Sequence, residues 1–171
     1  GFRTDAPTAP QLAFHLTCSY AARKSWRLRT CKSAFLNGKE HDRDIYVRIP
    51  KEGLPGVETG SLIALIKGAY GLREAPRLWY LKAEAVLEGA GFEELSTARG
   101  AFVLRDRIGS KPGTVGLLVL HVDDACHAGT GPLCQAAMDY AFDHFVIDQH
   151  HEGDFNFLGR HVVQLPDGTI M

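Results

Sequence analysis

Apolar and polar residues alternate along this chain with two different periods, and these periods divide it into helices and strands. Apolar residues at helical spacing, bounded by Pro and Gly, predict helices at about 8–23, 76–90 and 132–145. Strict alternation or short apolar runs predict strands at about 26–34, 45–49, 101–105, 115–122 and 155–164. A further apolar run, 62–69, follows a loop rich in Pro and Gly at 50–60.

The order of these elements predicts an α+β fold, an antiparallel sheet with helices packed on one face. A chain of 171 residues with 45% hydrophobic residues is one domain, or most of one, with a substantial core. No apolar run is long enough to span a bilayer, and no signal peptide is visible. The chain opens on Gly1 and closes on Met171, and we expect it to be a piece of a longer protein.

The run 116–129 carries the strongest chemical signal in the chain. Its apolar residues lead directly into Asp123 and Asp124, and it ends at Gly129. Two carboxylates at the end of a buried strand are costly unless a cation meets them. A pair of Asp residues at a hairpin tip can hold a divalent metal through hard oxygen ligands, although Asp-Asp is also ordinary turn material.

The cysteines and the net charge limit the remaining possibilities. The four cysteines show no zinc-type spacing, and we expect free thiols in a reducing compartment, cytoplasmic or nuclear. Cys126, His127 and Cys134 are interpreted as packing and surface residues rather than as a metal site. The net charge of -1 argues against strong binding of nucleic acid. Basic residues nevertheless cluster locally, at Arg23, Lys24, Arg27, Arg29 and Lys32, with Arg73 and Arg77 further on.

Four segments together resemble the reverse transcriptase of Ty1/copia-type LTR retrotransposons. These segments read Lys-Ser-Ala-Phe-Leu-Asn-Gly at 32–38, Ala-Tyr-Gly-Leu-Arg-Glu-Ala-Pro-Arg-Leu-Trp-Tyr at 69–80, His-Val-Asp-Asp at 121–124 and Phe-Leu-Gly at 157–159. The family has Tyr-Gly-Leu-Lys-Gln-Ala/Ser-Pro-Arg-x-Trp-Tyr and Tyr-Val-Asp-Asp at the two middle segments. The resemblance extends from about Thr4 to the C-terminus.

The resemblance implies a polymerase palm with ferredoxin-like architecture over residues 1–171. The fingers segment would precede Gly1, and the thumb and RNase H portions would follow Met171. It further implies an RNA-directed DNA polymerase that acts on an RNA or DNA template-primer and a dNTP, with Mg²⁺ or Mn²⁺ in a two-metal mechanism. No membrane partner is expected.

The same resemblance assigns roles to individual residues. Asp123 and Asp124 would be the catalytic metal ligands. His121 would face the primer in place of the usual Tyr, and Glu74 replaces the usual Gln beside the phosphate path. The nucleotide and template pocket would comprise Phe35, Tyr70, Gly71, Arg73 and Pro76. The turn that positions the primer end would comprise Phe157, Leu158 and Gly159.

The chain departs from the family at the first catalytic Asp. Alignment on residues 32–38 places Thr30 at that position, and alignment on residues 26–29 leaves a two-residue deletion there. Neither alignment supplies a carboxylate, and a neutral Thr oxygen is a poor ligand for Mg²⁺. We therefore expect a polymerase domain that is inactive in this copy. The alternatives are a domesticated, non-catalytic scaffold that binds nucleic acid or protein, and, more distantly, an unrelated metal-dependent hydrolase.

Overall fold

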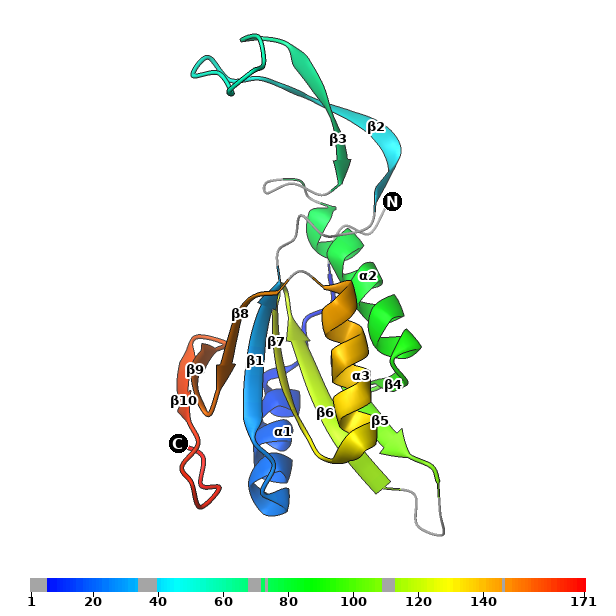
Figure 1. Cartoon of the computed structure of the whole chain (residues 1–171), viewed down its shortest axis with the longest axis vertical. Helices are drawn as coiled ribbons and strands as arrows, with labels where there is room; N and C mark the ends of the chain where they lie inside the picture. Colours follow the sequence, from blue (N-terminus) through cyan, green and yellow to red (C-terminus); the bar gives the residue numbers. More distant parts are fainter. Residues whose placement is uncertain (1–5, 34–39, 68–71, 73, 109–112, 146) are drawn as a thin grey trace.

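A six-stranded sheet forms the body of the protein in the computed structural model, which describes residues 6–33, 40–67, 72, 74–108, 113–145 and 147–171 (Figure 1). Its strands follow the spatial order β4-β5-β6-β7-β1-β8, and every neighbouring pair is antiparallel. The strands are β1 (Leu28–Ser33), β4 (Phe92–Leu95), β5 (Ala98–Asp106), β6 (Gly113–His121), β7 (Asp124–Gly129) and β8 (Ile147–Glu152). The helices are α1 (Gln11–Lys24), α2 (Ala75–Gly89) and α3 (Gly131–His144).

The two faces of the sheet are covered by different helices. Trp79 and Leu87 of α2 and Met138 of α3 are buried against Phe102 and Leu118 on one face. On the other face, α1 packs against strand side chains that point in the opposite direction, such as Val119 of β6 and Cys126 of β7. The α+β class is therefore as predicted, but the expectation that all helices lie on one face is wrong. The α1 helix carries buried Ala13, Phe14 and Ala21, and these residues require a second apolar face on the sheet.

The C-terminal segment is a hairpin rather than the single strand predicted at 155–164. Strands β9 (Asp154–Phe157) and β10 (Arg160–Val163) pair in antiparallel fashion around Leu158 and Gly159, whose φ angles are +53° and +71°. Buried Gln164, just after β10, joins this hairpin to the sheet. Its amide accepts a hydrogen bond from the Leu28 backbone N–H at 2.8 Å and donates one to the Trp26 carbonyl at 2.8 Å.

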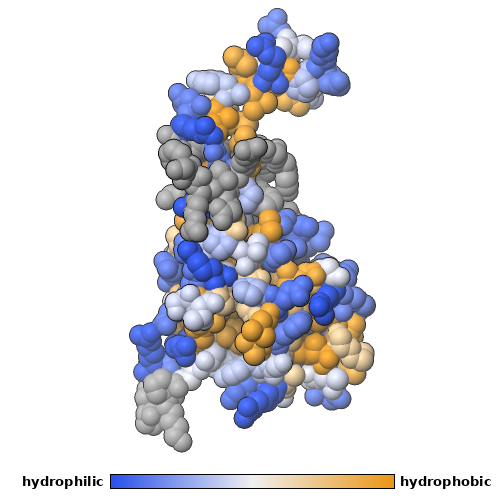
Figure 2. Space-filling view, turned by 180° about the vertical axis from the view of Figure 1, so that it is seen from behind, coloured by the Kyte–Doolittle hydropathy of each residue, from blue (hydrophilic) through white to orange (hydrophobic). Residues whose placement is uncertain are grey.

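A second ribbon, β2 (Glu40–Arg48) with β3 (Leu62–Lys67), extends from the end of the body near the start of α2 (Figure 1). Strand β2 is longer than the strand predicted at 45–49. Arg43 of β2 binds Glu74, just before α2, through two N–O contacts of 2.7 Å. Hydrophobic surface is visible along the ribbon in Figure 2. The exposed large side chains of the ribbon include Tyr46, Leu62 and Ile66.

Strands β4 and β8, at the two edges of the sheet, were absent from the sequence prediction. Both are short, and β8 carries polar residues at most of its positions. Within the described part of the chain, no helix is long and apolar enough to cross a membrane.

Gly100 on β5 tests how closely the N-terminal segment packs on the sheet. A Cβ at this position would lie 2.8 Å from the backbone N of Ala9, and that N–H donates to the Leu120 carbonyl at 3.0 Å. We expect Gly100→Ala to lower the free energy of unfolding by about 1–3 kcal/mol more than Gly91→Ala, because backbone must move. Gly91 has a similar φ of +92°, but its Cβ would meet only a Leu104 side-chain carbon at 3.6 Å. Equal losses in urea denaturation would contradict this packing.

Candidate active site

The two candidate carboxylates lie at the tip of the β6–β7 hairpin. His121 pairs with Asp124 across the hairpin, so the loop consists of Val122 and Asp123 alone. Val122 has a φ of +56°, which is costly for a β-branched residue, and Asp123 is not among the described residues with positive φ. Positive φ at only the first loop residue is the pattern of a type II′ hairpin turn. The chain is therefore strained directly beside the carboxylate pair.

Helix α2 holds this strained turn in place through Trp79. The Trp79 side chain is 3% exposed, and its Nε1–H donates to the Val122 carbonyl at 2.8 Å. Its ring also packs against Phe145, with the ring centroids 5.3 Å apart. The helical spacing at 76–90 predicts that Trp79 is buried, but it does not predict which distant carbonyl the indole reaches. Trp79 is both a core residue and an anchor for the loop.

Strand β1 lies beside β7 and presents its polar side chains to the carboxylates. Thr30 is the register partner of Cys126, and Lys32 is the partner of Asp124. Side chains two residues apart on a strand share a face, so Thr30, Lys32 and Asp124 lie on the same face of the sheet. The structure therefore places Thr30 one diagonal step from Asp124, at the distance of about 7–8 Å typical of diagonal neighbours.

The charges at this site are partly balanced by Lys32. Its Nζ lies 4.0 Å from Asp123 Oδ2 and 3.9 Å from Asp124 Oδ1. Burial raises the pKa of Asp124 above its ordinary value, and the charge of Asp123 raises it further, whereas Lys32 and His121 act in the opposite direction. The Nδ1 atom of His121 is buried and has no hydrogen-bond partner among the described residues. The carboxylates are thus crowded and only weakly neutralised.

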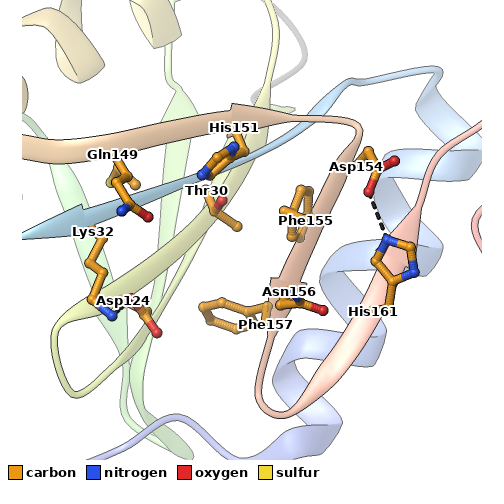
Figure 3. Close-up of a pocket in the computed structure, with 11 residues that line it drawn as sticks. Thr30, Lys32, Asp124, Gln149, His151, Asp154, Phe155, Asn156, Phe157 and His161 are labelled. Atoms are coloured by element: carbon orange, nitrogen blue, oxygen red, sulfur yellow. Dashed lines mark hydrogen bonds and ion pairs between the residues drawn. The ribbon is translucent and has the colours of Figure 1, made fainter.

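A cavity of about 420 Å³ opens between this face and the β9–β10 hairpin (Figure 3). Thr30, Lys32 and Asp124 line it together with His151 of β8 and Phe157 of β9. On its far side, His161 Nε2 lies 2.7 Å from Asp154 Oδ1, as the dashed line in Figure 3 marks. His151, Asp154 and His161 were missed from the sequence, and no signal there placed 147–152 beside β1.

The remaining predicted site residues are distributed around this cavity or fall outside the described structure. Phe157 lines the cavity, and Leu158 and Gly159 form the turn that follows it. Pro76 lies in the first turn of α2, next to Glu74, whose carboxylate is held by Arg43. The predicted pocket residues outside the described residues are Phe35, Tyr70, Gly71 and Arg73.

The basic cluster seen in the sequence does not form one continuous stripe. Arg29 alternates with Lys32 across β1 and lies on the opposite face of the sheet, beside His127. Arg27 and Arg29 both contact Glu152, with N–O distances of 3.4 Å and 2.6 Å. Three of the five basic side chains are therefore paired with carboxylates, Arg27 and Arg29 with Glu152 and Lys32 with the two Asp residues.

The described donors do not fit a two-metal site. They comprise the carboxylates of Asp123 and Asp124 and the neutral hydroxyl of Thr30, with an ammonium group 4.0 Å and 3.9 Å from the carboxylate oxygens. Among the described residues, no group of three or more His, Cys, Asp or Glu side chains is arranged to hold a metal ion. A site for hard divalent cations gains affinity from its count of charged oxygen ligands, and the described residues bring only two carboxylates, Asp123 and Asp124, to this hairpin tip.

Comparison with known families defines the class of protein that carries this hairpin and its carboxylates. Residues 3–164 match the family model described as reverse transcriptase (RNA-dependent DNA polymerase). The match spans most of the chain, so the chain belongs to this reverse transcriptase family, and the resemblance to copia-type elements is confirmed.

Two curated relatives come from Arabidopsis thaliana, and both are retrovirus-related Pol polyproteins. The relative from transposon RE1 is 27% identical over 168 residues, and the one from transposon RE2 is 25% identical over 168 residues. Each alignment covers 96% of this chain and 11% of the relative, so the chain spans about a tenth of their length. No solved structure matches it significantly.

Substitution can separate the contribution of the Trp79–Val122 hydrogen bond to stability from the contribution of Trp79 ring packing. We expect Trp79→Phe to lower the free energy of unfolding by about 1 kcal/mol more than Trp26→Phe, because it also leaves the Val122 carbonyl without its donor. Trp26 is 6% exposed, and its indole donates to no described residue, which makes it a matched control. Indistinguishable urea midpoints for the two variants would show that the hydrogen bond adds nothing.

The raised pKa of Asp124 gives a pH-dependent stability of definite sign. Its charged form is disfavoured in the folded state, so it costs stability above the folded pKa, and this cost disappears as pH falls toward the unfolded value. We expect Asp124→Asn to be more stable than the wild type at neutral pH, with the difference narrowing as pH falls.

Asp167→Asn is the control for this prediction. The Thr169 backbone N–H donates to Asp167 Oδ1 at 2.9 Å and lowers the pKa of Asp167, so this variant should be less stable at neutral pH. Urea unfolding measured from about pH 3 to pH 8 checks both signs. If Asp124→Asn is instead less stable than the wild type at neutral pH, the attraction between Lys32 and Asp124 outweighs the cost of burying the Asp124 charge.

Proposed function

We propose that this chain forms the palm of a retrotransposon reverse transcriptase and that this copy does not carry out nucleotidyl transfer. The observation that carries the proposal is the position of Thr30 on β1, beside the Asp123–Asp124 hairpin. The resemblance implies a carboxylate there, and neither alignment of the chain supplies one. The family membership supports the first part of the proposal, and the donor set supports the second.

The order of elements within the body supports the palm assignment. Strand β1, helix α2, strands β6 and β7, helix α3 and strand β8 come in the chain order β-α-β-β-α-β, which is the ferredoxin-like pattern, with β2 and β3 inserted before α2 and β4 and β5 inserted after it. Strand β1 lies between β7 and β8, so the first strand of the pattern is brought beside the hairpin. A palm needs this adjacency, because its carboxylates come from both elements.

Chemistry at this site would depend on groups that the chain supplies only in part. In the family, divalent metals activate the primer hydroxyl and stabilise the displacement at phosphorus. Here Asp123 and Asp124 supply negative charge, Lys32 offsets some of it, and Thr30 offers a hydroxyl that stays protonated. The template-primer and the dNTP remain the proposed partners, and Phe157 with the Leu158–Gly159 turn would contact the primer end.

A non-catalytic scaffold is the second candidate, and the cavity favours it. The site has lost its bridging carboxylate, whereas the cavity of about 420 Å³ beside it keeps an apolar wall of Phe155 and Phe157. A cavity of this size would take one group of a bound template-primer or partner protein, without nucleotide transfer. Under this alternative, template-primer binding persists in every variant of the carboxylates.

Restoring the missing carboxylate tests the proposal directly. We expect the wild-type chain to bind Mn²⁺ weakly, and Thr30→Asp to tighten binding by about tenfold or more, because ligand charge sets the affinity of such sites. Electron paramagnetic resonance of free Mn²⁺ measures this. Thr59→Asp adds the same charge on the exposed loop of the β2–β3 ribbon and should leave Mn²⁺ binding unchanged.

Primer extension supplies the second measurement. With flanking polymerase segments of a copia-type relative fused to the chain, the wild type should extend no primer, and Thr30→Asp should recover some extension. Thr30 is 7% exposed, so circular dichroism must first show that the variant folds. Robust extension by the unmodified chain in Mg²⁺ or Mn²⁺ would overturn the proposal, whatever the outcome for Thr30→Asp.

A further inference from the structure

A second cavity lies on the face of the sheet opposite the carboxylates. It has a volume of about 350 Å³ and opens between the start of α3 and strands β1, β7 and β8. Arg29, His127 and His150 line it, one from each of these strands. Arg29 and His127 are register partners, and they alternate with Thr30 and Cys126. The cavity is therefore separate from the candidate active site.

His127 is the buried polar group of this cavity. It is 4% exposed, and its Nε2 has no hydrogen-bond partner among the described residues. Its ring lies between two other lining residues, edge-on to Phe142 at 5.9 Å and stacked on His150 at 6.3 Å between centroids. A buried ring nitrogen without a partner costs free energy, which a ligand in the cavity would recover.

The N-terminus of α3 adds backbone donors to the same cavity. This helix of 14 residues begins at Gly131, and its N-cap residue Thr130 makes no side-chain capping bond. Its first turn contains no acidic residue, and Thr130, Gly131 and Cys134 all line the cavity. The first N–H groups of a helix have no intrahelical acceptor, and the helix dipole favours an anion near them. Pro132 has no N–H, so the free donors in this first turn are the N–H groups of Gly131 and Leu133.

The charged groups around the cavity are predominantly cationic. Arg29 Nε binds Glu152 at 2.6 Å, and Arg27 shares that carboxylate at 3.4 Å, so two guanidinium groups meet one carboxylate. Glu152 itself does not line the cavity, and no acidic side chain is found among its described lining residues. Burial lowers the pKa of His127 to about 3, and the nearby Arg29 and His150 also lower it, so the ring is neutral and can donate from Nε2.

We propose that this cavity binds a phosphate-bearing anion, held by Arg29, the Nε2–H of His127, His150 and the first N–H groups of α3. Guanidinium, imidazole and helix N-terminal donors together form the donor set that recognises phosphate oxygens. The phosphate group can belong to free phosphate or to a nucleic-acid backbone. The proposal does not depend on the carboxylate site, because the two cavities lie on opposite faces of the sheet and share no lining residue.

Isothermal titration of the whole chain with inorganic phosphate tests this site. We expect saturable binding that weakens by about tenfold in Arg29→Met and in His127→Phe, because each removes a hydrogen bond to a charged ligand. Arg48→Met removes the same charge from the ribbon, where Arg48 binds the Gly60 carbonyl, and should leave binding unchanged. Because His127 is buried, the exposed His150→Gln variant provides a third measurement that does not risk the fold, and it should also weaken binding.

A second titration, with a primer-template duplex, distinguishes the two sources of phosphate. If the duplex displaces inorganic phosphate and Arg29→Met weakens both, the cavity takes a backbone phosphate. If the duplex leaves phosphate bound, the cavity takes a free anion. The proposal is overturned if the wild type shows no saturable phosphate binding, or if Arg29→Met and His150→Gln, correctly folded, bind phosphate as the wild type does.

Discussion

The position of β1 between β7 and β8 is the constraint on which both candidate sites depend. It pairs with β7 on one side and β8 on the other, and its backbone is also bound at Leu28 by the amide of Gln164. Because side chains alternate along a strand, this register sends Thr30 and Lys32 to one face and Arg29 and Cys31 to the other. A shift of β1 by one residue would exchange the two sets and abolish both sites.

The strained turn at Val122 is the second feature on which the carboxylate site depends. An extended chain would carry Asp123 and Asp124 to opposite faces of one strand, whereas a two-residue loop brings both near Lys32. The turn is held from outside the hairpin, by an indole on α2 and by the β1–β7 ladder. The side chain at position 30 can therefore change without loss of the turn, since Thr30 contributes to the β1–β7 ladder through its backbone.

Elements with a strong period were predictable from the sequence, and elements that depend on distant partners were not. The helices at 11–24, 75–89 and 131–144 and the apolar strands β5 and β6 follow directly from spacing. The β6–β7 hairpin was predicted from the resemblance to the family, because Asp-Asp alone is also ordinary turn material. Strand β8 carries His150, His151 and Glu152 in succession, and such a run has no alternation to detect. Its pairing with β1 supplies the ordering that its composition lacks.

The polar character of β8 has a consequence for the solubility of the fold. As the last strand in the order it presents a row of backbone groups to solvent, and an apolar strand in that place would be a template for edge-to-edge association. Exposed His150, His151 and Glu152 give this edge charge and hydration instead, and Gly153, with a φ of +71°, ends the strand there. The polar residues that made β8 unrecognisable as a strand in the sequence thus also disfavour edge-to-edge association of the sheet.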